Sequence, residues 1–193
     1  FETALVVDVF KVLDRLGFEP TLMPFRPNGK PLHVHGFLKW FASVGQKNAE
    51  HLWIIDKLGI PLIGVDPSMT LTYQSEYKES GIEVPTVMLM QDFLVKSLKA
   101  EEIVPSQSTK QYKLFAHCTE ATNASESVRS WQKVFTLIGQ RLEVENVGCC
   151  GMAGTYGHEV SQYEISKIIY SQSWESKIEM DVQTEILATG YSC

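Results

Sequence analysis

The chain has 193 residues, of which 44% are hydrophobic and 21% are charged, and its formal net charge is −6. This composition is typical of a globular protein with enough apolar side chains for a core, in one domain built of two halves. The acidic balance without a basic block argues against nucleic acid as a partner, and the apolar runs are too short to cross a bilayer. No signal peptide is recognised at the start, which predicts a cytoplasmic location.

Helix-like and strand-like segments alternate along the chain. Apolar residues spaced for one helical face indicate helices, and short apolar runs between turn residues indicate strands. In chain order, the pattern predicts a helix at 3–16, a strand at 21–25, a helix at 34–58 broken near Gly45, a strand at 61–65 and helices at 73–78 and 87–98. After a loop at 105–109 it predicts a strand at 112–116, a helix at 124–138, a strand at 142–147, a helix at 158–178 and a strand at 185–189.

This alternation predicts an α/β fold with a parallel β-sheet flanked by helices. We interpret the chain as two pseudo-repeated halves: residues 1–98 form a cysteine-free first repeat with a connector helix, 99–111 a linker, and 112–193 a second repeat with all four cysteines. The turn Pro27-Asn28-Gly29 falls where Cys149-Cys150-Gly151 falls. We also expect Asp66-Pro67-Ser68 to cap the helix that follows it.

The cysteines cluster in the second half. The stretch GCCGMAGTYGHE at 148–159 contains Cys149 and Cys150 among glycines, which allow positive φ angles and close approach of the backbone to a bound group. A small secreted disulfide scaffold would spread its cysteines along the chain. The clustering therefore favours a single metal or redox site.

Each cysteine position follows a predicted strand: Cys118 the first of the second half, Cys149 and Cys150 the second, and Cys193 the third. Because the carboxyl ends of parallel strands lie at one edge of a sheet, we expect the four thiols to meet there. Thiolates suit soft metals, meaning zinc or an iron–sulfur cluster. All four cysteines are therefore candidate metal and cofactor ligands.

Several alternatives stay open at this point. His117 and His158 flank the site and are either accessory ligands, proton relays or ordinary histidines. Free cysteines also pack as small hydrophobic residues, and a disulfide such as Cys118–Cys193 would need an oxidising compartment. A structural zinc domain that docks a partner is a further interpretation, as is a thiol–disulfide enzyme that uses Cys149–Cys150 with His158. No dinucleotide-binding fingerprint and no Ser/His/Asp arrangement is found, so no catalytic residue is predicted.

The motifs around the cysteines resemble a known family. Phe115-Ala116-His117-Cys118, the stretch 148–159 and Ala188-Thr189-Gly190-Tyr191-Ser192-Cys193 are similar to the CCG cysteine-rich domain of heterodisulfide reductase subunits and the glycolate oxidase iron–sulfur subunit. The long central motif most resembles that of bacterial FAD-linked D-2-hydroxyacid dehydrogenases of the D-lactate and D-2-hydroxyglutarate type. Residues 24–30 and 64–67 also look like the first repeat of that group, so the resemblance covers nearly the whole chain.

The resemblance implies that this chain is the C-terminal CCG portion of such a dehydrogenase. In that group a flavin domain and a ferredoxin-like module share the polypeptide, FAD lies outside this segment, and electrons pass through iron–sulfur centres to an acceptor such as a quinone or a cytochrome. An enzyme of this kind is expected in the cytoplasm or at the inner face of the plasma membrane. This fragment alone is not expected to be catalytic.

The chain departs from the family pattern in two places. The pattern has cysteines in both repeats, whereas residues 1–117 contain none, so one site is expected instead of two. The pattern also closes with a Cys-x-x-Cys pair, of which this sequence contains only Cys193. With four thiols, zinc stands beside an iron–sulfur cluster as the expected occupant.

Overall fold

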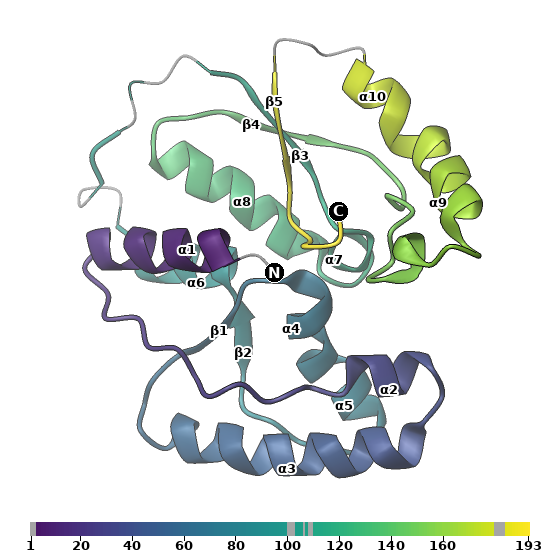
Figure 1. The fold of residues 1–193 in the computed structure, drawn as a ribbon. Helices are drawn as coiled ribbons and strands as arrows, with labels where there is room; N and C mark the ends of the chain where they lie inside the picture. The colour runs from purple at the N-terminus through teal and green to yellow at the C-terminus, as the bar shows by residue number, and fades with distance from the viewer. Residues whose placement is uncertain (1–2, 100–102, 106, 108–109, 180–183) are drawn as a thin grey trace.

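The computed structural model describes residues 3–99, 103–105, 107, 110–179 and 184–193 (Figure 1). Its helices are α1 (Thr3–Arg15), α2 (Lys30–Val34), α3 (Leu38–Asp56), α4 (Pro67–Gln74), α5 (Glu76–Glu79), α6 (Met90–Ser97), α7 (Cys118–Asn123), α8 (Ser125–Leu137), α9 (Tyr163–Tyr170) and α10 (Ser176–Glu179). A 3₁₀ turn, η2 (Tyr156–His158), and a π-helical turn, η3 (Ser171–Glu175), accompany them. The strands are β1 (Leu62–Gly64), β2 (Val87–Leu89), β3 (Tyr112–Phe115), β4 (Leu142–Glu145) and β5 (Glu185–Ala188).

The strands form two small parallel sheets, which confirms the predicted α/β class. In the first half β1 pairs with β2, with Leu62 opposite Val87. In the second half the strand order is β4-β3-β5, and Tyr112 lies opposite both Leu142 and Glu185. β3 is therefore the central strand of the sheet that carries the cysteine loops.

Helices cover both faces of the second sheet. Successive residues of a strand point to opposite faces, and on β3 both Leu114 and Phe115 are buried, as expected for a central parallel strand. Leu114 packs with Val128 of α8, whereas Phe115 packs with Trp174 of η3, their rings 4.9 Å apart at 81°. The sheet is thus held between α8 on one face and the α9–η3–α10 region on the other.

The two halves share a hydrophobic core. Leu13 of α1, Phe93 and Leu94 of α6, and Val134 of α8 are all buried in one cluster. α6 also makes a polar contact across the boundary, because the Gln91 side chain donates hydrogen bonds to Glu120 (2.7 Å) and to Ser127 (2.9 Å). The halves therefore pack against each other through an apolar cluster with a hydrogen-bonded polar group at its edge.

Most predicted elements are confirmed. The helices predicted at 3–16 and 124–138 and the strands predicted at 61–65, 112–116, 142–147 and 185–189 correspond to α1, α8, β1, β3, β4 and β5. The loop predicted at 105–109 falls partly on residues 106, 108 and 109, which lie outside the described residues. The division into repeats at 98 and 112 stays a prediction.

The predicted strand at 21–25 is wrong, since these residues form no ladder. Pro20 and Pro24 remove two backbone donors from this stretch, and Phe25 is 92% exposed. A segment with few donors and an exposed aromatic side chain gains little from joining a sheet.

The predicted break of the helix at 34–58 is also misplaced. α2 and α3 are separated at Gly36, which has φ +76°, whereas Gly45 is buried within α3. A Cβ at Gly45 would lie 2.6 Å from Ile82 Cδ1, so this glycine allows close packing instead of ending the helix.

Three further boundaries differ. The helix predicted at 87–98 begins as strand β2, because Val87 to Leu89 pair with β1 before α6 starts. The helix predicted from 158 starts at Tyr163, after η2 and the 96% exposed Val160. The short helix α7 occupies residues that were expected to be loop. Strand pairing and short turns depend on contacts outside the segment itself. The apolar periodicity of a single segment therefore does not predict them.

The contrast between Phe115 and Phe25 provides a direct test of this core. Phe115 is fully buried and Phe25 is 92% exposed. We expect Phe115→Ala to lower the free energy of unfolding by about 3–5 kcal/mol, since a large cavity would form. Phe25→Ala should change it by about 0.5 kcal/mol or less. Urea unfolding followed by circular dichroism measures both, and an equal loss for the two variants would contradict this core.

Candidate metal centre

The four cysteines lie at the carboxyl edge of the second sheet, on the segments that follow its three strands (Figure 1). Cys118 is the first residue of α7, shortly after Phe115 at the end of β3. Cys149 and Cys150 belong to the loop after β4, and Cys193 belongs to the turn after β5. The parallel register thus places three segments that are distant in sequence at one edge.

At Gly151 and Gly157 the glycine loop is held by contacts that leave no room for a side chain. Gly151 has φ +88°, and a Cβ there would lie 2.3 Å from the Ser166 carbonyl oxygen. The Ser166 hydroxyl donates to the Gly151 carbonyl (2.9 Å), and the indole N–H of Trp174 donates to the Gly148 carbonyl (3.1 Å). The loop is therefore packed directly onto α9 and η3.

The structure brings the four thiols together in one connected group. Cys150 Sγ lies 3.2 Å from Cys193 Sγ. Burial and the nearby thiols of Cys118 and Cys150 raise the pKa of Cys149, and the contact with Cys150, burial and the nearby Cys118 raise that of Cys193. No disulfide joins them, and Cys150 is the buried member of the group. The structure thus places the segments that carry the four cysteines at one edge of the sheet, while the meeting of the thiols at one metal site stays a prediction.

Backbone donors face two of the sulfur atoms. Gly151 N–H donates to Cys149 Sγ (3.4 Å), and the backbone N–H groups of Met152 and Ala153 are among the groups that lower the pKa of Cys150. Hydrogen bonds of this kind stabilise negative charge on sulfur and are usual around metal-bound thiolates. The donor set, sulfur with backbone N–H support, therefore fits a soft metal or an iron–sulfur cluster.

The thiols do not surround a single point. Among the described residues, no three or more cysteine, histidine, aspartate or glutamate side chains stand in an arrangement that would hold a metal ion as it is. The contact between sulfur atoms that the structure shows is the one between Cys150 and Cys193, and the Cys118 thiol acts on Cys149 only as one of several nearby groups that raise its pKa.

The contact between Cys150 and Cys193 separates their proton affinities. The hydrogen bond between the two thiols lowers the pKa of Cys150 to about 6, and backbone N–H groups add to this effect. The same hydrogen bond raises the pKa of Cys193, and burial raises it further. The two thiols therefore titrate as a pair, in which Cys150 loses its proton more readily than Cys193. Burial raises the pKa of Cys149.

The two predicted accessory histidines occupy different environments. His117 is buried, its Nδ1 accepts a hydrogen bond from Thr119 N–H (3.2 Å), and its backbone N–H donates to the Thr189 hydroxyl (2.9 Å). Burial lowers the pKa of His117, and the nearby Asp66 opposes this shift. His158 is exposed on η2. The structure thus associates His117 with the cysteine turns and leaves His158 at the surface.

A buried carboxyl group that the sequence did not reveal lies beneath the site. Glu120 of α7 is 0% exposed and accepts hydrogen bonds from Gln91 (2.7 Å) and from the Thr189 hydroxyl. Burial raises its pKa to about 7 despite these hydrogen bonds. Its sequence context, Cys-Thr-Glu, resembles any acidic first turn of a helix, so nothing in the sequence marked it as buried.

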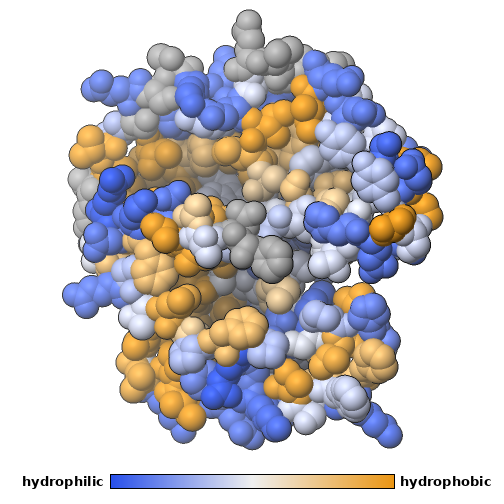
Figure 2. All heavy atoms as spheres, in the orientation of Figure 1, coloured by the Kyte–Doolittle hydropathy of each residue, from blue (hydrophilic) through white to orange (hydrophobic). Residues whose placement is uncertain are grey.

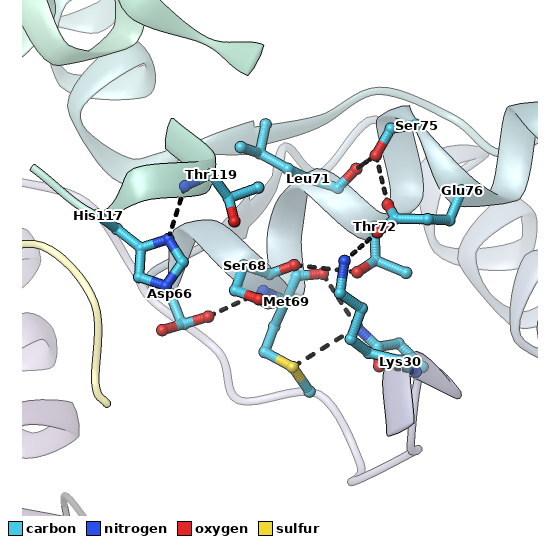
Figure 3. A network of polar contacts seen from close by, with 11 residues as sticks. Lys30, Asp66, Ser68, Met69, Leu71, Thr72, Ser75, Glu76, His117 and Thr119 are labelled. Carbon is cyan, nitrogen blue, oxygen red and sulfur yellow. Dashed lines mark hydrogen bonds and ion pairs between the residues drawn. The ribbon is translucent and has the colours of Figure 1, made fainter. Parts of the chain in front are cut away.

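A polar network of the first half reaches the same edge of the second sheet (Figure 3). Asp66, expected only as a helix cap, does cap α4, because its Oδ1 accepts from Met69 N–H (2.8 Å). In addition its Oδ2 accepts from Tyr191 N–H (3.1 Å) on the turn that carries Cys193. Lys30 of α2 forms an ion pair with Glu76 of α5 in the same network.

Comparison with known proteins shows several bacterial relatives that match the whole chain. The chain is 45% identical to a D-2-hydroxyglutarate dehydrogenase of Pseudomonas putida over 198 residues and 42% identical to one of Haemophilus influenzae over 203 residues. It is 40% identical to one of Escherichia coli over 196 residues. The chain corresponds to one part of these dehydrogenases. It spans only 19–20% of their length. No protein-family model and no solved structure matches it.

Two glycines of the cysteine loop allow a matched test of its geometry. Gly151 and Gly154 both have positive φ, but a Cβ at Gly151 would meet backbone atoms within 4 Å, whereas a Cβ at Gly154 would meet open space. We expect Gly154→Ala to cost about 1 kcal/mol from φ strain alone. Gly151→Ala should cost about 2–4 kcal/mol, because overpacking against Ser166 is added. Denaturant unfolding measures both, and equal losses would show that the loop is free to move away from α9.

The ion pair between Lys30 and Glu76 predicts a pH effect. Burial alone would raise the pKa of Glu76, but hydrogen bonds from Lys30 and Ser75 outweigh it and lower that pKa below its ordinary value of 4.5. A lowered carboxyl pKa contributes stability above the unfolded-state value, and this stability is lost as the pH falls through the folded-state value. We expect the Glu76→Gln variant to lose less stability than the wild type as the pH falls below about 5. Glu50→Gln, at an exposed position, should leave that pH dependence unchanged in thermal unfolding.

Proposed function

We propose that this chain is the CCG cysteine-rich portion of a flavin-linked D-2-hydroxyacid dehydrogenase and that its four cysteines bind one metal centre. The proposed ligands are Cys118, Cys149, Cys150 and Cys193. The observation that carries the proposal is the connected group of thiols at three strand ends, with Cys150 and Cys193 only 3.2 Å apart. The relatives, which are named D-2-hydroxyglutarate dehydrogenases, support the class of reaction.

An iron–sulfur cluster at this position would accept and donate single electrons. In the proposed enzyme, FAD lies in another part of the polypeptide and takes up the electrons removed from the hydroxyacid. The residues of this chain would supply the ligands, hold the loop on α9 through Gly151 and Ser166, and stabilise thiolate charge through backbone N–H groups. The proposed electron acceptor is a quinone or a cytochrome, as the family resemblance implies, with the enzyme in the cytoplasm or peripheral at the inner face of the plasma membrane.

Exposed apolar surface supports contact with other domains of the same polypeptide. Figure 2 shows hydrophobic side chains gathered on part of one face, and side chains more than half exposed include Leu22, Phe25, Phe37, Trp40 and Ile54. Exposed apolar side chains gathered on one face are typical of surfaces that pack against a partner. The proposed partners are the flavin and ferredoxin-like domains. Among the described residues, no helix is long and apolar enough to span a membrane.

Two alternatives have support of their own. Zinc in place of a cluster would make the site structural, and an all-cysteine ligand set suits zinc equally well. A thiol–disulfide activity is favoured by the low pKa of Cys150 and its contact with Cys193. In that case the reacting pair would be Cys150 and Cys193 rather than the adjacent Cys149 and Cys150.

Metal analysis of the full-length protein tests the proposal. We expect the anaerobically purified enzyme to contain more iron and acid-labile sulfide than a Cys150→Ser, Cys193→Ser double variant, with a matching loss of absorbance and EPR signal. This difference isolates the present site, because clusters elsewhere in the polypeptide are common to both proteins. Thr155→Ala, at an exposed position of the same loop, serves as the control and should retain the metal.

The outcomes separate the alternatives. If the wild type contains stoichiometric zinc and the double variant does not, the site has a structural role instead of a role in electron transfer. Equal metal content in wild type and double variant, with equal thermal stability, would overturn the metal centre altogether. Rapid alkylation of Cys150 in such a metal-free protein would then favour thiol–disulfide chemistry.

A further inference from the structure

The turn that carries Cys193 is held by residues from both halves of the chain. Cys193 N–H donates to the Gly190 carbonyl (3.0 Å), which closes the turn on itself. On the side of the second half, the Thr189 hydroxyl accepts from His117 N–H and donates to Glu120. On the side of the first half, Tyr191 N–H donates to Asp66 Oδ2 (3.1 Å). The last contact joins residues that are 125 positions apart.

Asp66 uses its two carboxylate oxygens for two different tasks. Oδ1 accepts from Met69 N–H (2.8 Å) and caps α4, and Oδ2 is thereby directed towards Tyr191. The Asp66 carbonyl also accepts from the Thr70 hydroxyl (2.7 Å), so the backbone is held as well. Asp66 is 9% exposed. A buried carboxylate fixed at one oxygen and by its backbone presents the other oxygen in a defined position.

The His117 ring packs against the Cys193 turn close to Asp66. A Cβ at Gly190 would lie 2.3 Å from His117 Cδ2 and 3.3 Å from Cys193 Sγ, so ring, turn and thiol are in close contact. His117 Nδ1 accepts from Thr119 N–H, which places the proton of the neutral ring on Nε2. In Figure 3 this second nitrogen lies on the side of Asp66. The ring therefore has little freedom to move.

We propose that Asp66 is a positioning residue for the thiol centre: through Tyr191 N–H it holds the turn that keeps Cys193 beside Cys150. The contact gives the cysteine-free half a specific role at the site of the other half. The consequence for metal retention rests on the proposed function, whereas the consequence for the position of Cys193 does not.

Substitution of Asp66 can separate the cap from the contact with the turn. Asparagine and serine are both good N-cap residues, so Asp66→Asn and Asp66→Ser each keep an acceptor for α4. Asparagine has only one acceptor oxygen, and its amide N–H₂ would face a donor at one of the two positions. Serine has a single, shorter-reaching hydroxyl. Neither variant can therefore satisfy Met69 N–H and Tyr191 N–H together.

The decisive measurement is the alkylation rate of each cysteine in the full-length protein after metal removal. Iodoacetamide labelling at fixed pH, followed by peptide mass spectrometry, reports Cys193 and Cys118 separately. In both Asp66 variants we expect labelling of Cys193 to accelerate on the order of tenfold or more, as for the loss of a charge-assisted hydrogen bond, while labelling of Cys118 is unchanged. Ser68→Ala, in the first turn of the same helix, leaves the carboxylate that accepts from Tyr191 intact and should behave like the wild type.

Two results would overturn the role of Asp66. Unchanged labelling of Cys193 in both variants would show that the turn does not need this acceptor. A parallel acceleration at Cys118 and Cys193, together with a lower melting temperature, would show that Asp66 stabilises the fold as a whole and does not position Cys193. The loss of metal to a chelator, measured on the same variants before metal removal, reports on the metal centre. If the wild type holds no metal at this site, the proposed function fails, but the labelling result still decides the role of Asp66.

Discussion

The parallel register of β4, β3 and β5 is the constraint on which the candidate site depends. Because Phe115 lies opposite both Glu145 and Ala188, the three strands end at the same level of the sheet. Each strand is followed at once by a cysteine-bearing segment, so short loops are enough to place the cysteines near one another. A slip of one residue in either pairing would turn a strand's side chains to the other face and move its loop away from the group. The buried Leu114 and Phe115, packed on opposite faces, hold the register.

The thiol group illustrates how a soft-metal site and a redox-active pair share the same physical basis. The contact with the Cys193 thiol and backbone N–H groups lower the pKa of Cys150, so the proton that the pair shares is held more tightly by Cys193. A metal would replace that proton and satisfy both sulfur atoms, since metal binding to thiols releases protons. Without a metal, the same contact leaves one nucleophilic sulfur beside a second thiol.

The cysteine-free half contributes to the site in spite of its composition. It supplies α6 to the shared core, Gln91 to the buried Glu120, and Asp66 to the turn of Cys193. The Lys30–Glu76 ion pair and the cap of α4 stiffen the region from which Asp66 projects. If the two halves arose by duplication, the copy without thiols has kept a structural task at the site of the other copy.

Local patterns in the amino-acid sequence are sufficient to predict the class of fold, the main strands and helices of the second half, and the set of four cysteines. Apolar periodicity, glycines and the position of each cysteine after a strand are all properties of short segments. The contact of Cys150 with Cys193, the burial of Glu120, the strand β2 and the contact of Asp66 with Tyr191 emerge only when the chain is folded. Each depends on partners distant in the chain, and hydrogen bonds such as that of Asp66 Oδ2 leave no periodic trace in the sequence. The failed strand at 21–25 shows the converse, because an extended apolar stretch becomes a strand only where another strand offers it a partner.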